Sequence, residues 1–133
     1  MELVILIVVL ALVEYLVFAA QVGRARVKYN VKAPAMIGHP VFERLLRVQQ
    51  NTIEQLIVFI PSIFCFAYIA ESLGWPGHET AAVLGVIYLI GRAIYSRSYV
   101  RDPATRSLGF LLTFFPSAVM IAGTLIGILI SIM

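Results

Sequence analysis

The sequence has few charged residues and a single cysteine. Only 13% of its 133 residues are Asp, Glu, Lys or Arg, well below the roughly 25% of an ordinary soluble chain, while 61% are hydrophobic. A soluble domain of this length has too little interior to bury that much apolar surface. Cys65 lies inside an apolar stretch and has no partner for an internal disulfide, so it carries no information about the redox compartment. The composition therefore indicates an integral membrane protein.

The sequence motifs of several chemistries are also absent. No phosphate-binding glycine loop, Ser-His-Asp arrangement or metal-ligand spacing occurs. His39 and His78 fall in separate loops and do not predict a shared metal site. The net charge of +3 comes from basic residues between apolar blocks, where membrane topology and anionic lipid account for it better than nucleic acid does. We therefore expect neither a metal nor a nucleic-acid partner.

Four long apolar blocks occupy most of the chain, at residues 3–22, 53–70, 81–94 and 108–133. A spanning helix needs about 20 mostly apolar residues, and a barrel strand would be shorter and alternating. With their flanking turns, the blocks predict helices at about 2–23, 41–71, 79–101 and 104–132 in a single domain, 1–133. The first block has no Lys or Arg before Arg24, unlike a signal peptide. We therefore interpret it as the first spanning helix.

The connections between the blocks predict how the helices are arranged. Gly74, Pro76 and Gly77 indicate a tight turn between the second and third helices. Asp102-Pro103 is typical of a helix start, with Asp as the cap and Pro at the first position. Short connections make consecutive helices antiparallel. The predicted fold is therefore all-α, an integral membrane four-helix bundle with up-down topology.

The distribution of basic residues predicts the orientation in the membrane. Nine of the ten basic residues lie in the first and third connections or the adjoining helix ends: Arg24, Arg26, Lys28, Lys32, Arg44, Arg47, Arg97, Arg101 and Arg106. The second connection has none and carries Glu71 and Glu79 instead. Basic loops stay in the cytoplasm. We therefore expect these two connections to be cytoplasmic and both termini outside, in a bacterial inner membrane.

Polar residues recur at helical spacing near the predicted cytoplasmic face. One set lies on one face of the second helix: Arg44, Arg47, Asn51 and Glu54. A second set lies on one face of the third helix: Tyr88, Arg92, Tyr95 and Tyr99. Arg106 follows near the start of the fourth helix. Ionisable residues at this depth are costly and need a partner or a function.

These polar residues can be interpreted in two ways, as interfacial anchors or as a binding site. Arg and Tyr near helix ends commonly act as interfacial anchors, but anchors should scatter around a helix instead of sharing one face. A binding site is the alternative, because arginines grip carboxylates and a carboxylate binds an ammonium group. A small zwitterionic peptide with two carboxylates and one amine would satisfy the set. Glutathione fits that description, although the chemistry alone does not name it.

The same residues resemble signatures of a known family. The run Phe42-Glu43-Arg44-x-x-Arg47-x-Gln49-x-Asn51-x-x-Glu54 resembles the second-helix signature of the MAPEG family, the membrane-associated proteins in eicosanoid and glutathione metabolism. The run from Tyr88 through Arg92 and Tyr95 to Tyr99 resembles its third-helix signature, and Arg106 matches an arginine of its glutathione-using members. The resemblance covers most of the chain.

The resemblance implies an assembly and a set of residue roles. It implies a homotrimer that binds glutathione between subunits on the cytoplasmic side. Arg47, Asn51 and Glu54 would hold the glutathione backbone, with Gln49 nearby and Tyr95 and Tyr99 in contact from the third helix. Arg92 and Arg44 would support the site, and a first-loop arginine, Arg26 or Arg24, would approach it. Arg106 would stand by the thiol as the catalytic residue.

The resemblance further implies an enzyme, a membrane glutathione transferase or peroxidase acting in detoxification. It would activate the glutathione thiolate and attack lipophilic electrophiles or reduce hydroperoxides that arrive from the lipid. Gln55 stands where leukotriene-producing members have Tyr, so the sequence does not favour that activity.

The main alternative is a non-catalytic lipid-binding member of the same fold, which has no need for this arginine and carboxylate set. A small transporter is a third reading, but transporters place their sites near the membrane midplane. The second substrate is left open.

Overall fold

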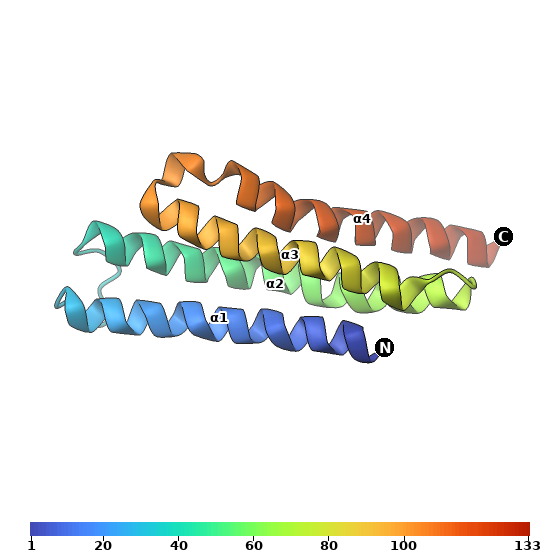
Figure 1. Cartoon of the computed structure of the whole chain (residues 1–133), viewed down its shortest axis with the longest axis horizontal. Coiled ribbons are helices and arrows are strands. Elements are labelled where there is room, and N and C mark those ends of the chain that lie inside the picture. The colour runs from blue at the N-terminus through green and yellow to red at the C-terminus, as the bar shows by residue number, and fades with distance from the viewer.

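The computed structural model describes residues 1–133 as four long helices and one short 3₁₀ turn (Figure 1). The helices are α1 (Glu2–Lys28), α2 (Pro40–Ser72), α3 (Gly77–Arg101) and α4 (Ser107–Ile132), and the turn η1 (Pro103–Thr105) precedes α4. They run alternately up and down, so both termini lie at the same end of the bundle. All four segments are long and apolar enough to cross a membrane. The all-α up-down membrane bundle expected from the sequence is thus confirmed.

Local chemistry explains where α2 begins and α1 ends. His39 is extended, its Nδ1 accepts a hydrogen bond from the Val41 amide at 3.2 Å, and Pro40 occupies the first turn of α2. The first helix continues to Lys28, five residues beyond its expected end. The chain leaves the helix through Tyr29 and Asn30, which has φ of 54°. Asn tolerates this left-handed conformation better than most residues.

The start of α4 differs from the sequence prediction. Asp102 caps a segment as expected, because its Oδ1 accepts a hydrogen bond from the Ala104 amide at 3.0 Å. The segment that it caps is η1, and α4 begins only at Ser107 instead of at about residue 104. Arg106 therefore occupies the N-cap position of α4. Asp followed by Pro starts a short 3₁₀ helix as readily as an α-helix, so the motif alone does not separate them.

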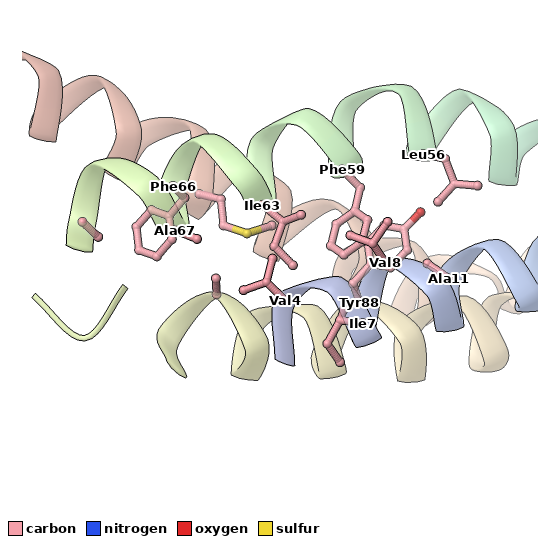
Figure 2. Close-up of a cluster of buried hydrophobic side chains, with 13 residues drawn as sticks. Val4, Ile7, Val8, Ala11, Leu56, Phe59, Ile63, Phe66, Ala67 and Tyr88 are labelled. Atoms are coloured by element: carbon pink, nitrogen blue, oxygen red, sulfur yellow. The ribbon is translucent and has the colours of Figure 1, made fainter. Parts of the chain in front are cut away.

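The helices pack around α2 and α3, which form the centre of the bundle. Helix α1 packs on one side of this pair and α4 on the other (Figure 1). The main core joins α1, α2 and α3, and Met120 adds α4 to it (Figure 2). Its α1 members Val4, Ile7, Val8 and Ala11 recur at helical spacing. The rings of Phe59 and Tyr88 stack with centroids 3.7 Å apart and link α2 to α3 at the middle of this core.

Glycines allow α4 to approach its neighbours closely. A Cβ on Gly91 would lie 2.7 Å from the carbonyl carbon of Leu112, and a Cβ on Gly109 would meet the backbone of Tyr95. A Cβ on Gly123 would lie 2.6 Å from the ring of Phe66 in α2. Small residues serve such contacts in membrane bundles because they let backbones come together. The contact of α3 with α4 holds the start of α4 beside Tyr95.

We expect Gly91→Ala to destabilise the bundle by about 1–3 kcal/mol, because the added methyl runs into α4 backbone that cannot move aside. Thermal unfolding in detergent micelles, followed by circular dichroism, measures the change. Gly23→Ala is the matched control, since a Cβ there meets nothing within 4 Å. It should be neutral or slightly stabilising. Equal unfolding midpoints for the two variants would contradict the close contact.

Candidate functional site

The polar residues singled out in the sequence gather at one end of the bundle. This is the end where α1 and α3 finish and α2 and α4 begin, opposite the two termini (Figure 1). Three helices contribute to it, since α2 and α3 each present a polar face and Arg106 lies just before α4. The structure therefore brings most of the predicted site residues into one region.

The polar face of α2 is held together by a carboxylate. Arg47 donates from Nη1 to Glu54 Oε1 at 3.0 Å and from Nη2 to Oε2 at 3.5 Å. Asn51 donates from Nδ2 to Glu54 Oε2 at 3.3 Å. The side chains of Arg47 and Glu54 are 46% and 53% exposed, so their polar groups remain open to a ligand or to a second copy of the chain.

Arg92 joins the polar faces of α3 and α2. Its side chain is fully buried. Its Nη1 donates to Asn51 Oδ1 at 3.0 Å and its Nη2 donates to Thr52 Oγ1 at 2.7 Å. Its guanidinium carbon lies 4.4 Å from the ring centroid of Tyr95. Arg47, Glu54, Asn51 and Arg92 thus form one continuous polar network that runs from the surface into the bundle.

A row of aromatic rings leads from Arg92 to Arg106. Tyr95 is buried and stacks on Tyr99 with centroids 5.4 Å apart. The guanidinium carbon of Arg106 lies 5.9 Å from the centroid of Tyr99. Arg106 itself is exposed, at the N-terminus of α4. A helix N-terminus and a guanidinium both favour a negative charge placed beside them.

Three other predicted site residues make contacts apart from this network. Arg44 donates from Nη1 to the carbonyls of Val100 and Arg101, at 3.1 and 3.0 Å, and so ties the end of α3 to α2. Arg26 donates to the Ala35 carbonyl at 2.8 Å and lies over the ring of Phe42, so within one chain it braces the first connection.

Gln49 is the third predicted site residue outside the network, and its Nε2 donates to the Tyr15 hydroxyl of α1 at 3.5 Å. Arg24, the alternative to Arg26, lies in a shallow cavity beside Lys28 and Tyr29. None of these side chains forms a hydrogen bond or ion pair with Arg47, Glu54 or Arg106.

An apolar groove runs between α2 and α4. Two adjoining cavities of about 310 and 360 Å³ share Val58, Ile121 and Leu125. The first is also lined by Pro61, and the second reaches Gln55, the residue after Glu54. A lipophilic molecule in this groove would therefore reach the turn of α2 that carries the polar network.

Glu14 of α1 is a residue that sequence reasoning missed. It lies on the buried face of the helix, one turn from Ala11 and from Phe18, and its Oε2 is buried. The available signal was a lone carboxylate in a stretch without other charges between Leu3 and Gly23. An ionisable residue inside a spanning segment deserves a functional hypothesis by default.

The arrangement suits an anionic or zwitterionic ligand of small size. Arg47 and Arg106 present guanidinium groups, which bind carboxylates in bidentate fashion, and Glu54 presents a carboxylate that can bind an ammonium group. The chain has no group of three His, Cys, Asp or Glu residues that could hold a metal ion. Fold and polar residues together define a bundle of four helices long and apolar enough to cross a membrane, with a cluster of charged residues at one end.

The particular family follows from comparison with known proteins. Residues 4–126 match the MAPEG family, and the chain belongs to it. The chain is 42% identical over 124 residues to an uncharacterised protein of Synechocystis sp., covering 93% of this chain and 86% of the relative.

Two relatives carry functional names. The chain is 39% identical over 97 residues to human microsomal glutathione S-transferase 2, covering 72% of this chain and 61% of that protein. It is 36% identical over 90 residues to guinea-pig (Cavia porcellus) leukotriene C4 synthase, covering 67% of this chain and 55% of that protein. The chain thus spans less than two thirds of the length of these two relatives.

We expect Thr52→Val to destabilise the protein by about 1–3 kcal/mol, because it removes a hydrogen bond that the buried charge of Arg92 depends on. The midpoint of denaturation in mixed detergent micelles measures the effect. Thr124→Val is the matched control, since Thr124 Oγ1 only donates to the Met120 carbonyl of its own helix. A Thr52 variant as stable as the Thr124 variant would show that Arg92 does not need this acceptor.

Proposed function

We propose that this protein is a membrane-bound glutathione-dependent enzyme, of the glutathione transferase or glutathione peroxidase type. It would activate the thiolate of glutathione and direct it at lipophilic electrophiles or hydroperoxides. The observation that carries the proposal is the network of Arg47, Glu54, Asn51 and Arg92, in a chain that belongs to the MAPEG family. The relatives named as a glutathione S-transferase and a leukotriene C4 synthase support it.

The network supplies groups that match the charges of glutathione. The tripeptide has two carboxylates and one ammonium group. Arg47 would bind a carboxylate and Glu54 the ammonium group, and Asn51 would contribute neutral hydrogen bonds. Arg92 would act indirectly, by fixing the orientation of Asn51 through the 3.0 Å hydrogen bond. Tyr95, Tyr99 and Gln49 would line the remainder of the site.

Arg106 is the residue that we assign to the thiol. A free thiol has a pKa of about 8.5, and only the thiolate is a good nucleophile. The positive guanidinium and the N-terminus of α4 would both stabilise the anion. The thiolate would then attack the electrophilic carbon of an acceptor, displacing its leaving group or adding across a double bond, to form a thioether. With a hydroperoxide it would attack the distal oxygen, which breaks the O–O bond, releases the alcohol and leaves the sulfenic acid of glutathione. A second glutathione would convert this sulfenic acid to the disulfide and water.

The groove between α2 and α4 gives a lipophilic acceptor a route to the site. Its lining is almost entirely apolar, it includes Pro61, and it reaches Gln55 beside Glu54. An acceptor dissolved in the bilayer would move along this groove without crossing water. The groove also suits the second candidate function, a lipid-binding protein without catalysis, which would use the groove and leave the polar network idle.

The site is proposed to be completed by a second copy of the chain. Arg47 and Glu54 lie half exposed at the bundle surface, and a homotrimer would bring residues of a neighbouring α3 and α4 against them. Arg44 and Arg26 would support the site, Arg26 by moving from its contact with Ala35. The basic end would face the cytoplasm of a bacterial inner membrane, because basic connections remain inside.

We expect Arg106→Ala to leave glutathione binding largely intact and to abolish the ultraviolet absorbance of bound thiolate, because only the group that stabilises the anion is lost. Difference spectra of the detergent-solubilised protein with saturating glutathione measure this signal. Arg97→Ala, an exposed arginine at the end of α3, is the matched control. A thiolate signal that persists without Arg106 would refute its assigned role.

We expect Glu54→Gln to weaken glutathione binding about 10- to 100-fold, as the loss of a hydrogen bond to a charged group would. Equilibrium dialysis with radiolabelled glutathione measures the affinity, and Glu79→Gln at the opposite end of the bundle is the control. If the unchanged protein binds no glutathione at millimolar concentration, the enzyme proposal fails and the lipid-binding function takes its place.

A further inference from the structure

Glu14 lies partly buried in the middle of α1, and one of its carboxylate oxygens is fully buried. The buried face of this helix includes Ala11 on one side of it and Phe18 on the other, so Glu14 follows the same stripe. It takes part in none of the three ion pairs of the chain. A carboxylate in a spanning helix is costly unless another group compensates its charge. The proposed function gives Glu14 no role.

Three buried polar atoms have no hydrogen-bond partner within the chain. They are Glu14 Oε2, the Tyr88 hydroxyl and Arg92 Nε. In Figure 2 the Tyr88 hydroxyl points to the end of the core marked by Ala11 and Leu56, from which α1 continues toward Glu14. Tyr88 and Arg92 lie one turn apart on the buried face of α3, and Tyr88 packs in the same core as Ala11, one turn before Glu14. Buried polar atoms are rarely left unpaired, and three unpaired atoms from neighbouring side chains indicate a shared partner.

The chemistry of the three atoms is complementary. Arg92 Nε donates, the Tyr88 hydroxyl donates or accepts, and a Glu14 carboxylate oxygen accepts. One water molecule can accept from Arg92 and Tyr88 and donate to Glu14. A buried water typically makes about three such hydrogen bonds.

The charge of Arg92 supplies the second, independent argument. Its direct hydrogen-bond acceptors, Asn51 and Thr52, are both neutral. Two carboxylates lie on the helices beside it: Glu54, which accepts from Asn51, and Glu14, between the buried Ala11 and Phe18 of α1. Glu54 already pairs with Arg47. Glu14 is therefore the carboxylate left to balance the buried guanidinium.

We propose that Glu14 is the counter-charge of Arg92 through one water that is also bound by Tyr88, and that it thereby acts as a positioning residue for the glutathione site. The water bound to Glu14 on α1 holds the Nε group of the guanidinium, and the two Nη groups donate to Asn51 and Thr52 on α2. Asn51 in turn orients Glu54. Glu14 acts on the ligand only through Arg92, and its role in binding rests on the proposed function.

The test is glutathione affinity measured by equilibrium dialysis on the full-length protein in detergent, for Glu14→Gln, Tyr88→Phe and the double variant. Glu14→Gln should weaken binding about tenfold, as coupled residues of one network do, while the thiolate absorbance per bound glutathione stays unchanged. Tyr88→Phe keeps the ring that stacks on Phe59 and should weaken binding less. The double variant should bind as Glu14→Gln alone, because both side chains act on Arg92 through the same water. Glu2→Gln, on the same helix and exposed, should match the unchanged protein.

Other results would overturn the proposal. An unchanged affinity in Glu14→Gln removes the positioning role, and a reduced folded fraction with unchanged affinity assigns Glu14 to stability alone. Independent effects of the Glu14 and Tyr88 variants exclude the shared water.

If the unchanged protein does not bind glutathione, the proposed function fails separately. The water-mediated interaction of Glu14 with Tyr88 is then tested by the unfolding midpoints of the same variants. Non-additive changes of the midpoint support the water shared by Glu14 and Tyr88, and additive changes exclude it.

Discussion

The buried guanidinium of Arg92 is the constraint on which the polar end of this bundle depends. A charge inside a membrane bundle is cut off from bulk water, so every donor on it needs an acceptor from the protein or from a bound molecule. Asn51 and Thr52 of α2 provide two of these acceptors, and the ring of Tyr95 covers the guanidinium face. The positions of α2 and α3 relative to each other are therefore specified by polar contacts as well as by apolar packing.

The bundle divides its tasks along its length. Toward the termini, α1, α2 and α3 pack through small and branched apolar side chains around the stack of Phe59 on Tyr88. Toward the other end, the close contact of Gly109 with Tyr95 sets the start of α4 beside α3. This approach places Arg106 over Tyr99. The position of Arg106, the candidate catalytic residue, thus depends on the contact of Gly109, three residues further along the chain, with Tyr95.

Much of the fold follows from the sequence because long apolar blocks and short Gly/Pro connections leave few arrangements. Helical spacing also predicts that Arg47, Asn51 and Glu54 share a face, and the structure brings them into contact. The predicted start of α4 is wrong by about one turn, since Asp102-Pro103 is equally compatible with a 3₁₀ helix. Spacing on one helix carries no information about cross-helix partners, so the bond from Arg92 to Thr52 and the place of Glu14 were not predicted.

The most direct test of this account is the hydrogen exchange of individual arginine side chains, measured by nuclear magnetic resonance on ¹⁵N-arginine-labelled protein in detergent micelles. The account predicts that the guanidinium protons of Arg92 remain long after transfer to deuterium oxide, while those of the exposed Arg97 exchange at once. It also predicts that the Arg92 signals shift when glutathione is added. Exchange of Arg92 as fast as that of Arg97 would contradict the claim that a buried guanidinium organises the site.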